Sequence, residues 1–158
     1  MKHAILFVFS TFFSLQAVAE GLPEGALEDP TAIGPYDAVE ANLSDFLWLK
    51  RPVVVFADTP ADPRFKRQIE LLEARPQALI DREVVILVDT DPKTPSDIRT
   101  KLRPRGFMMV LIGKDGEVEL RKPSPWDIRE ITRAIDKMPL RLQELKEMRA
   151  AQDAELND

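Results

Sequence analysis

Four hydrophobic stretches of the chain have the pattern of strands. Residues 53–57 and 84–88 are continuous apolar runs, mostly β-branched, which is typical of strands covered on both faces. A third run, residues 107–112, leads through Asp115-Gly116 into residues 118–121, where apolar and polar side chains alternate. These last two runs predict a β-hairpin with a tight primed turn at Asp115-Gly116, and a one-sided hairpin needs a sheet beside it and helices over it.

Amphipathic helices are expected between and after these strands. Apolar side chains recur at helical spacing in three places, namely Phe65, Ile69 and Leu72, then Ile98 and Leu102, then Ile128, Ile131 and Ile135. Each set follows a hydroxyl residue, a proline and, one residue further on, an aspartate. We therefore predict that Thr59, Thr94 and Ser124 are N-caps, each followed by a proline at the first helical position and an acid at the third: Asp62, Asp97 and Asp127.

The remaining segments set the domain limits. Residues 1–19 combine a positive start, an apolar region and the small-residue motif Ala17-Val18-Ala19, so we expect a signal peptide cut after Ala19, export to the periplasm or medium, and no remaining membrane anchor. Residues 20–35 are rich in proline and glycine and are expected to form an extended lead. Residues 36–138 would form one domain, with Trp48 in its core, and residues 139–158 a C-terminal helix and tail. The narrow stripe Leu142, Leu145 and Met148 fits a helix lying on the domain surface, or one that docks a partner or a second copy.

Composition excludes several kinds of chemistry for this chain. It has no cysteine, and its single histidine, His3, lies within the expected signal peptide. Thiol exchange, imidazole bases, Ser-His-Asp triads and metal sites built on nitrogen or sulfur ligands are therefore excluded. The net charge of −5 argues against nucleic acid as a partner, and we expect no cofactor.

The predicted order, strand, helix, strand, helix, strand, strand, helix, is that of a thioredoxin-like α/β core with a mixed central sheet, helices on both faces and an extra C-terminal helix. Residues 105–112, the Asp-Gly hairpin and the closing helix resemble the thioredoxin pattern, although Cys-x-x-Cys and the cis-proline are missing at residues 58–64 and at Met108. The chain also resembles the DUDES-type domain, a thioredoxin-like or peroxiredoxin-like family of unknown function found in small secreted proteins. That resemblance rests on residues 51–57, Gln68, Leu72, residues 81–85, Gly106 and residues 136–141. It implies the fold and export, and no catalytic residue.

Two hypotheses for a site follow from the strand ends. Asp58 and Thr59 follow the first strand, Asp89 and Asp91 follow the second, and Arg105 precedes the hairpin, so these side chains are expected at one edge of the sheet. Asp58, Asp89 and Asp91 are weak candidates for a Mg²⁺ or Ca²⁺ site or for a phosphate site, in a cation-dependent hydrolase or a phosphate-binding protein. Aspartates also favour turns, because they hydrogen-bond to nearby backbone amides, and this explains the same three acids without a bound ligand.

The second hypothesis, which we prefer, is a redox-inactive module that binds another exported protein or has a structural role. Its surface would include Met108, which adapts to irregular partners, and the arginines Arg64, Arg67, Arg129 and Arg133, which would bind acidic groups. The same arginines are equally well explained as residues on the solvent-facing sides of amphipathic helices. Catalysis is not expected.

Overall fold

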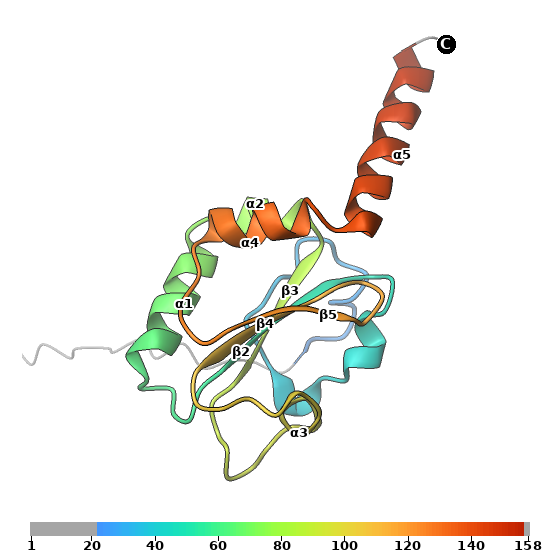
Figure 1. Cartoon of the computed structure of the whole chain (residues 1–158). Helices are drawn as coiled ribbons and strands as arrows, with labels where there is room; N and C mark the ends of the chain where they lie inside the picture. Colours follow the sequence, from blue (N-terminus) through green and yellow to red (C-terminus); the bar gives the residue numbers. More distant parts are fainter. Residues whose placement is uncertain (1–21, 157–158) are drawn as a thin grey trace, which may run out of the picture.

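The computed structural model describes residues 22–156, and the expected signal peptide lies outside them. The chain forms one five-stranded sheet in the order β1-β3-β2-β4-β5, with helices on both faces (Figure 1). The strands are β1 (Tyr36–Asp37), β2 (Arg51–Phe56), β3 (Val84–Asp89), β4 (Met108–Ile112) and β5 (Val118–Lys122). The helices are the short 3₁₀ segments η1 (Ala38–Glu40) and η2 (Leu43–Phe46), then α1 (Pro63–Glu73), α2 (Pro76–Ile80), α3 (Asp97–Leu102), α4 (Ile128–Ile135) and α5 (Pro139–Leu156).

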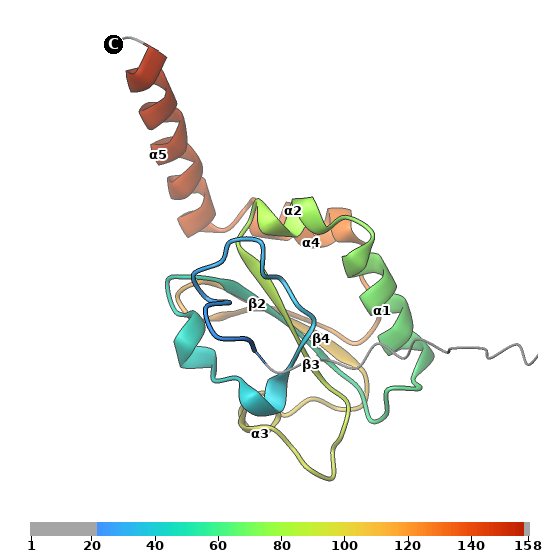
Figure 2. The ribbon, with the colours of Figure 1, turned by 180° about the vertical axis from the view of Figure 1, so that it is seen from behind.

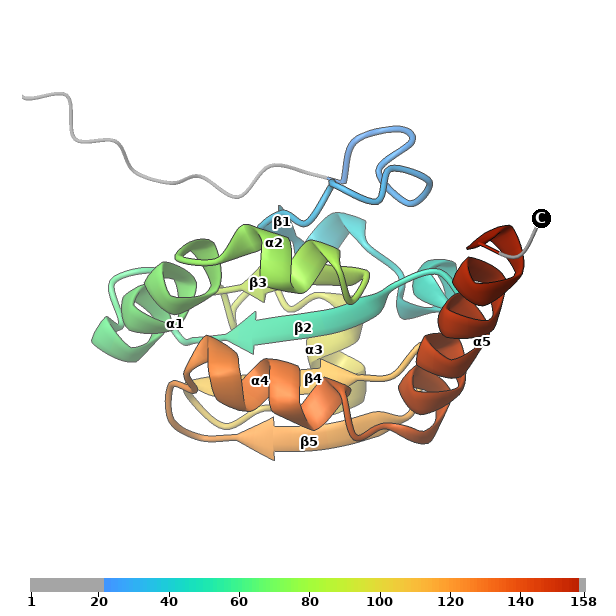
Figure 3. The same ribbon diagram turned by 90° about the horizontal axis from the view of Figure 1, so that it is seen from above.

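The topology is that of a thioredoxin-like core, as predicted. Strand β2 pairs parallel with β3 on one side and antiparallel with β4 on the other, and β4 pairs antiparallel with β5. The two-residue strand β1, which the sequence pattern did not reveal, extends the parallel edge beside β3. Figure 3 shows β1 and β5 toward opposite edges of the sheet.

Two hydrophobic clusters cover the two faces of the sheet. One face packs against α1, α2 and α4, through Leu72, Leu79, Ile128, Ile131 and Ile135. The other packs against α3, the 3₁₀ segments and the N-terminal segment, through Ile98, Leu102, Ala38 and Phe46. Every residue of β2 and β3 is buried, because these central strands are covered on both sides.

The three helices begin two or more residues later than the sequence predicts. Asp62 and Asp127 are themselves the N-caps of α1 and α4, and their carboxylates accept hydrogen bonds from the backbone of Arg64 and Arg129. In α3 the N-cap is Ser96. The hydroxyl N-caps predicted at Thr59, Thr94 and Ser124 are therefore wrong, since an Asx or Ser cap closer to the apolar periodic residues takes the position.

The hairpin turn also differs from the prediction. Both primed turns need positive φ at the first central residue, whereas here Asp115 is not in the left-handed region and the positive φ, 83°, is at Gly116. The Gly116 amide donates to the Gly113 carbonyl at 3.0 Å, and the Gly113 amide donates to Glu117 at 2.9 Å. The turn is thus a longer loop, and the β4–β5 ladder shifts register between Leu111 and Ile112.

The N-terminal part of the described chain packs against the sheet. Residues 22–35 form turns, and Leu22 and Leu27 lie against the second cluster. The Ile86 amide donates to the Ile33 carbonyl at 2.7 Å, which continues the parallel edge toward β1. Trp48, expected in the core, is 65% exposed and has a φ of 64°, so that expectation is wrong. It lies in a loop, and its backbone amide donates to the Lys114 carbonyl at 2.7 Å.

The last helix leaves the domain. Figures 1 and 2 show α5 projecting away from the sheet, with only its first turns near the other elements. Within residues 22–156, no helix combines the length and the apolar character needed to cross a membrane.

Candidate functional site

A buried ionic cluster occupies the carboxyl ends of β2 and β3. The Nε–H group of Arg99, on α3, donates to Asp89 Oδ1 at 2.8 Å, and the Ser96 hydroxyl donates to Asp89 Oδ2 at 2.6 Å. Arg99 Nη2 donates to the carbonyls of Ala57 and Asp89 at 2.7 and 2.8 Å. Arg99 also lies over the Phe56 ring. This cluster ties α3 to both central strands, and both oxygens of Asp89 are engaged in it.

Arg99 was missed by the sequence reasoning. It follows Ile98 on a helix whose apolar face was recognised, and an arginine beside an apolar stripe is normally solvated. The sequence signal that could have revealed its burial is the position of Arg99, since residues 98, 99 and 102 share one side of a helix and all three are buried in α3. Burial of an arginine requires partners, and Asp89 supplies the charge.

The structure brings part of the predicted surface together. Asp58 is exposed, and its carboxylate lies 3.7 Å from where a Cβ on Gly106 would be. Arg64 lies over the Phe107 ring at 5.5 Å and pairs with Asp62 at 2.8 Å. The hydrogen bond from Arg64 holds the pKa of the Asp62 carboxyl below its usual value.

The other predicted residues have separate surroundings. Thr59 accepts from the Ala61 amide, and Arg67 pairs along α1 with Glu70. Asp91 accepts from the Lys93 amide, and this backbone hydrogen bond lowers its pKa, as expected for a turn residue. Arg105 is exposed, and Met108 is half-buried, with its sulfur 4.0 Å from Arg121 Nη1.

The predicted carboxylate site for a cation does not form. In residues 22–156, no three Asp, Glu, His or Cys side chains are grouped so that they could hold a metal ion. Asp89 is already paired with Arg99 and Ser96, while Asp91 caps its own turn. The cation-dependent hydrolase therefore stays a prediction that no grouping of acids in residues 22–156 supports.

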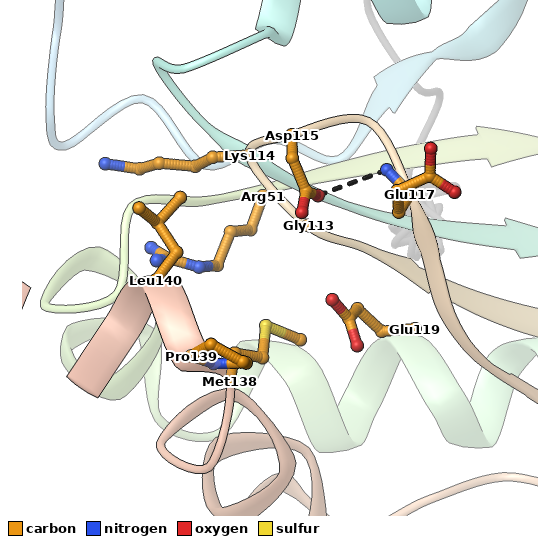
Figure 4. A pocket seen from close by; sticks show the side chains of 9 residues that line it. All are labelled: Arg51, Gly113, Lys114, Asp115, Glu117, Glu119, Met138, Pro139 and Leu140. Atoms are coloured by element: carbon orange, nitrogen blue, oxygen red, sulfur yellow. Dashed lines mark hydrogen bonds between the residues drawn. The ribbon is translucent and has the colours of Figure 1, made fainter. Parts of the chain in front are cut away.

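A pocket lies at the opposite end of the sheet, beside the base of α5 (Figure 4). It has a volume of about 340 Å³ and is lined by Arg51, Gly113, Lys114, Asp115, Glu117, Glu119, Met138, Pro139 and Leu140. In Figure 4 the acidic side chains come from the hairpin loop and β5, across from Met138 and Pro139. A Cβ on Gly113 would meet the carboxylate of Asp115, so glycine allows that side chain to fold over the loop.

The two bases of this pocket are already compensated. Arg51 is fully buried, and its Nη2 donates to Glu144 Oε1 at 2.9 Å. Lys114 pairs with Glu83 and, at 3.2 Å, with Glu144. Partial burial acts to raise the pKa of the Glu144 carboxyl, but hydrogen bonds from Arg51 and Arg141 outweigh it and hold that pKa below its usual value.

This second ionic cluster fixes the start of α5. Arg141 is buried, and its Nη2 donates to the Asp81 carbonyl at 2.9 Å, while its Nη1 donates to Glu144 Oε2 at 3.1 Å. Beyond residue 145 every described residue of α5 is exposed. The helix is therefore anchored at its first turns and exposed to solvent along residues 146–156.

Comparison with known proteins gives a family and several similar folds. Two peroxiredoxin structures from Plasmodium are similar to this chain. The Plasmodium vivax 2-Cys peroxiredoxin has 20% sequence identity and a TM-score of 0.49, and covers 68% of this chain and 85% of its own. The Plasmodium yoelii Prx1a has 23% identity and a TM-score of 0.48, and covers 68% of this chain and 81% of its own.

The family model described as "Domain of unknown function (DUF4174)" matches residues 42–144, from η2 into the first turns of α5. The expected resemblance is thus confirmed as a domain of unknown function with a thioredoxin-like fold and no cysteine, while the DUDES-type name stays an expectation. Because the match extends over more than half of the sequence, the chain belongs to the DUF4174 family.

Proposed function

We propose that this chain is an exported, redox-inactive module that binds another protein through α5. The absence of cysteine leaves its thioredoxin-like fold without the thiolate that disulfide exchange requires. The observation that carries the proposal is the geometry of α5, which is anchored by buried charges at its base and exposed beyond it.

An isolated helix of this kind gains little stability by itself. Isolated helices shorter than about 12–15 residues are marginal in water, and most helical stability in proteins comes from packing an apolar face. Leu142 and Met148 on α5 are 47% and 46% exposed. A partner that covered this face would bury both side chains and stabilise the free part of the helix.

The ionic cluster gives the helix a fixed direction. Arg51, Arg141 and Glu144 are joined by hydrogen bonds that involve both the domain and the first turns of α5. Buried charges of this kind are costly to separate, so the helix does not swing freely about its base. A helix held in one direction presents its face to a partner with less entropy to lose on binding.

Export is supported by the sequence pattern of residues 1–19. Fractionation of expressing cells followed by N-terminal sequencing tests it. We expect the protein outside the cytoplasm with Glu20 as its first residue. A cytoplasmic protein that keeps Met1 would contradict export.

The binding role is tested by affinity capture of exported proteins, washed at high salt, with paired variants. The variant Leu142→Gln/Met148→Gln changes the apolar face, and Ala150→Gln/Ala154→Gln changes exposed positions on the other side of the helix. We expect one stoichiometric partner that the wild type and the alanine variant retain and the first variant loses. An empty capture, or equal retention by both variants, would contradict binding through α5.

A further inference from the structure

A run of basic residues joins α3 to β4 in a protein that is acidic as a whole. Residues 98–114 contain five basic side chains and no acid, although the chain carries a net charge of −5. Two of the five, Arg99 and Lys114, are buried and paired with carboxylates. The other three, Lys101, Arg103 and Arg105, are exposed and make no ion pair with any residue between 22 and 156.

A fourth cation comes from the neighbouring edge strand. Arg121 on β5 reaches across to the end of α3, where its Nη1 donates to the Leu102 carbonyl at 2.7 Å. It therefore lies beside the backbone between Lys101 and Arg103, and it too makes no ion pair within the described chain. We call Lys101, Arg103, Arg105 and Arg121 the basic surface.

The contact of Arg121 with the Leu102 carbonyl places it beside residues 101–103, and none of the four cations forms an ion pair within residues 22–156. Arg103 is the C-cap of α3, in a left-handed conformation with a φ of 50°, and the exposed carbonyl end of a helix favours positive charge. Met108 lies half-buried beside Arg121 and adds a polarisable apolar contact. Asp58 is an acid close to this surface, because its carboxylate lies beside Gly106, the residue after Arg105.

We propose that the basic surface binds an acidic segment of a partner protein. Guanidinium groups match carboxylates in paired hydrogen bonds, and three of the four cations are arginines. Long polyanions such as nucleic acid, and anionic membranes, would also approach the acidic remainder of the protein and be repelled by it. A short acidic segment touches the basic surface alone.

This proposal names a partner chemistry for the binding role proposed above, but it uses a surface separate from α5. The two can therefore fail independently, because the α5 variants leave the basic surface intact and the variants below leave α5 intact.

The test is fluorescence anisotropy of a labelled ten-residue peptide of alternating Asp and Glu with one central Phe. The purified full chain is titrated into it at low salt and again at physiological salt. The variant Lys101→Gln/Arg103→Gln/Arg105→Gln removes three cations of the basic surface. Its control, Lys66→Gln/Arg129→Gln/Arg133→Gln, removes three exposed cations from α1 and α4, so the net charge changes equally.

We expect at least about tenfold weaker binding for the first variant, less than about twofold change for the control, and weaker binding at higher salt. Asp58→Asn should bind the peptide more tightly than the wild type, because it removes the neighbouring negative charge. Circular dichroism checks that each variant is folded. The proposal is overturned by no binding at low salt, by equal losses in the two triple variants, or by tighter binding of a single-stranded oligonucleotide or of phosphatidylglycerol vesicles than of the peptide.

Discussion

Replacing Arg99 with methionine is the sharpest test of how this fold is held together. The substitution keeps the length of the side chain but removes the partner of Asp89, whose side chain is 1% exposed. Asp89 would keep its hydrogen bond from Ser96 but would carry an uncompensated buried charge. The carbonyls of Ala57 and Asp89 would each lose a donor from the guanidinium.

The expected cost is large relative to the stability of the domain. Removing one partner of a buried ion pair costs about 3–5 kcal/mol, whereas a domain is stable by about 5–15 kcal/mol in total. We expect Arg99→Met to lower the free energy of unfolding by about 3–5 kcal/mol, measured by urea titration with far-ultraviolet circular dichroism. The exposed control Arg129→Met should change it by less than about 0.5 kcal/mol.

The double variant Asp89→Asn/Arg99→Met separates lost charge pairing from lost packing. If the buried charge is the main cost, the double variant recovers at least about 1 kcal/mol relative to Arg99→Met. The reasoning is refuted if Arg99→Met costs less than about 1 kcal/mol, or if neutralising Asp89 makes the variant still less stable. Either result would mean that Asp89 is hydrated or that packing dominates.

Three further predictions concern other parts of the chain. Gln68 is fully buried and exchanges hydrogen bonds with the Trp126 backbone, at 3.1 Å as donor and 2.8 Å as acceptor, so Gln68→Leu should lower the free energy of unfolding by about 1–3 kcal/mol. Urea titration measures this, and a loss below about 0.5 kcal/mol would contradict it. The lowered pKa of Glu144 means that its charge stabilises the fold above the unfolded pKa of about 4.3 and that this stability is lost as pH falls through the folded pKa. The difference in urea midpoint between wild type and Glu144→Gln should therefore be constant above about pH 5.5 and shrink below about pH 4. A difference that grows as pH falls would contradict the expected direction of the Glu144 contribution to stability. Trp48→Gly should leave the free energy of unfolding unchanged or raise it by up to about 1 kcal/mol, because glycine tolerates the left-handed φ and little buried area is lost. A melting temperature lowered by several degrees would contradict this and would show that the Trp48 side chain is packed.

Much of the fold follows from local pattern. The runs at residues 53–56 and 84–88 lack alternation because both faces of these strands are covered, and that pattern alone identifies them as central strands. Helical spacing likewise identified the buried faces of α1, α3 and α4. Exact helix starts were less predictable, because Thr59 and Asp62 are both good caps and the choice between them depends on where the chain leaves the preceding strand.

The candidate surface was predicted less well. The strand-end rule placed Asp58 and Asp89 at one edge, but it could not tell that Asp89 is paired with a side chain ten residues later while Asp58 faces solvent. Of the four residues of the basic surface, the sequence analysis named only Arg105. Arg121 joins it from another strand, and no local pattern shows that contact.

The sequence by itself determined the order of the four longer strands and of α1, α3, α4 and α5, the burial of the central strands and the loss of thiol chemistry, because each depends on residue type or on local periodicity. Tertiary structure decided which charges are buried and which remain free. Arg51 is fully buried because Glu144, 93 residues later, reaches it, whereas Arg105 remains exposed without an ion pair in the described chain. The fate of a charge depends on partners that the fold brings from distant positions, since burial is tolerated only where an opposite charge and hydrogen bonds compensate it.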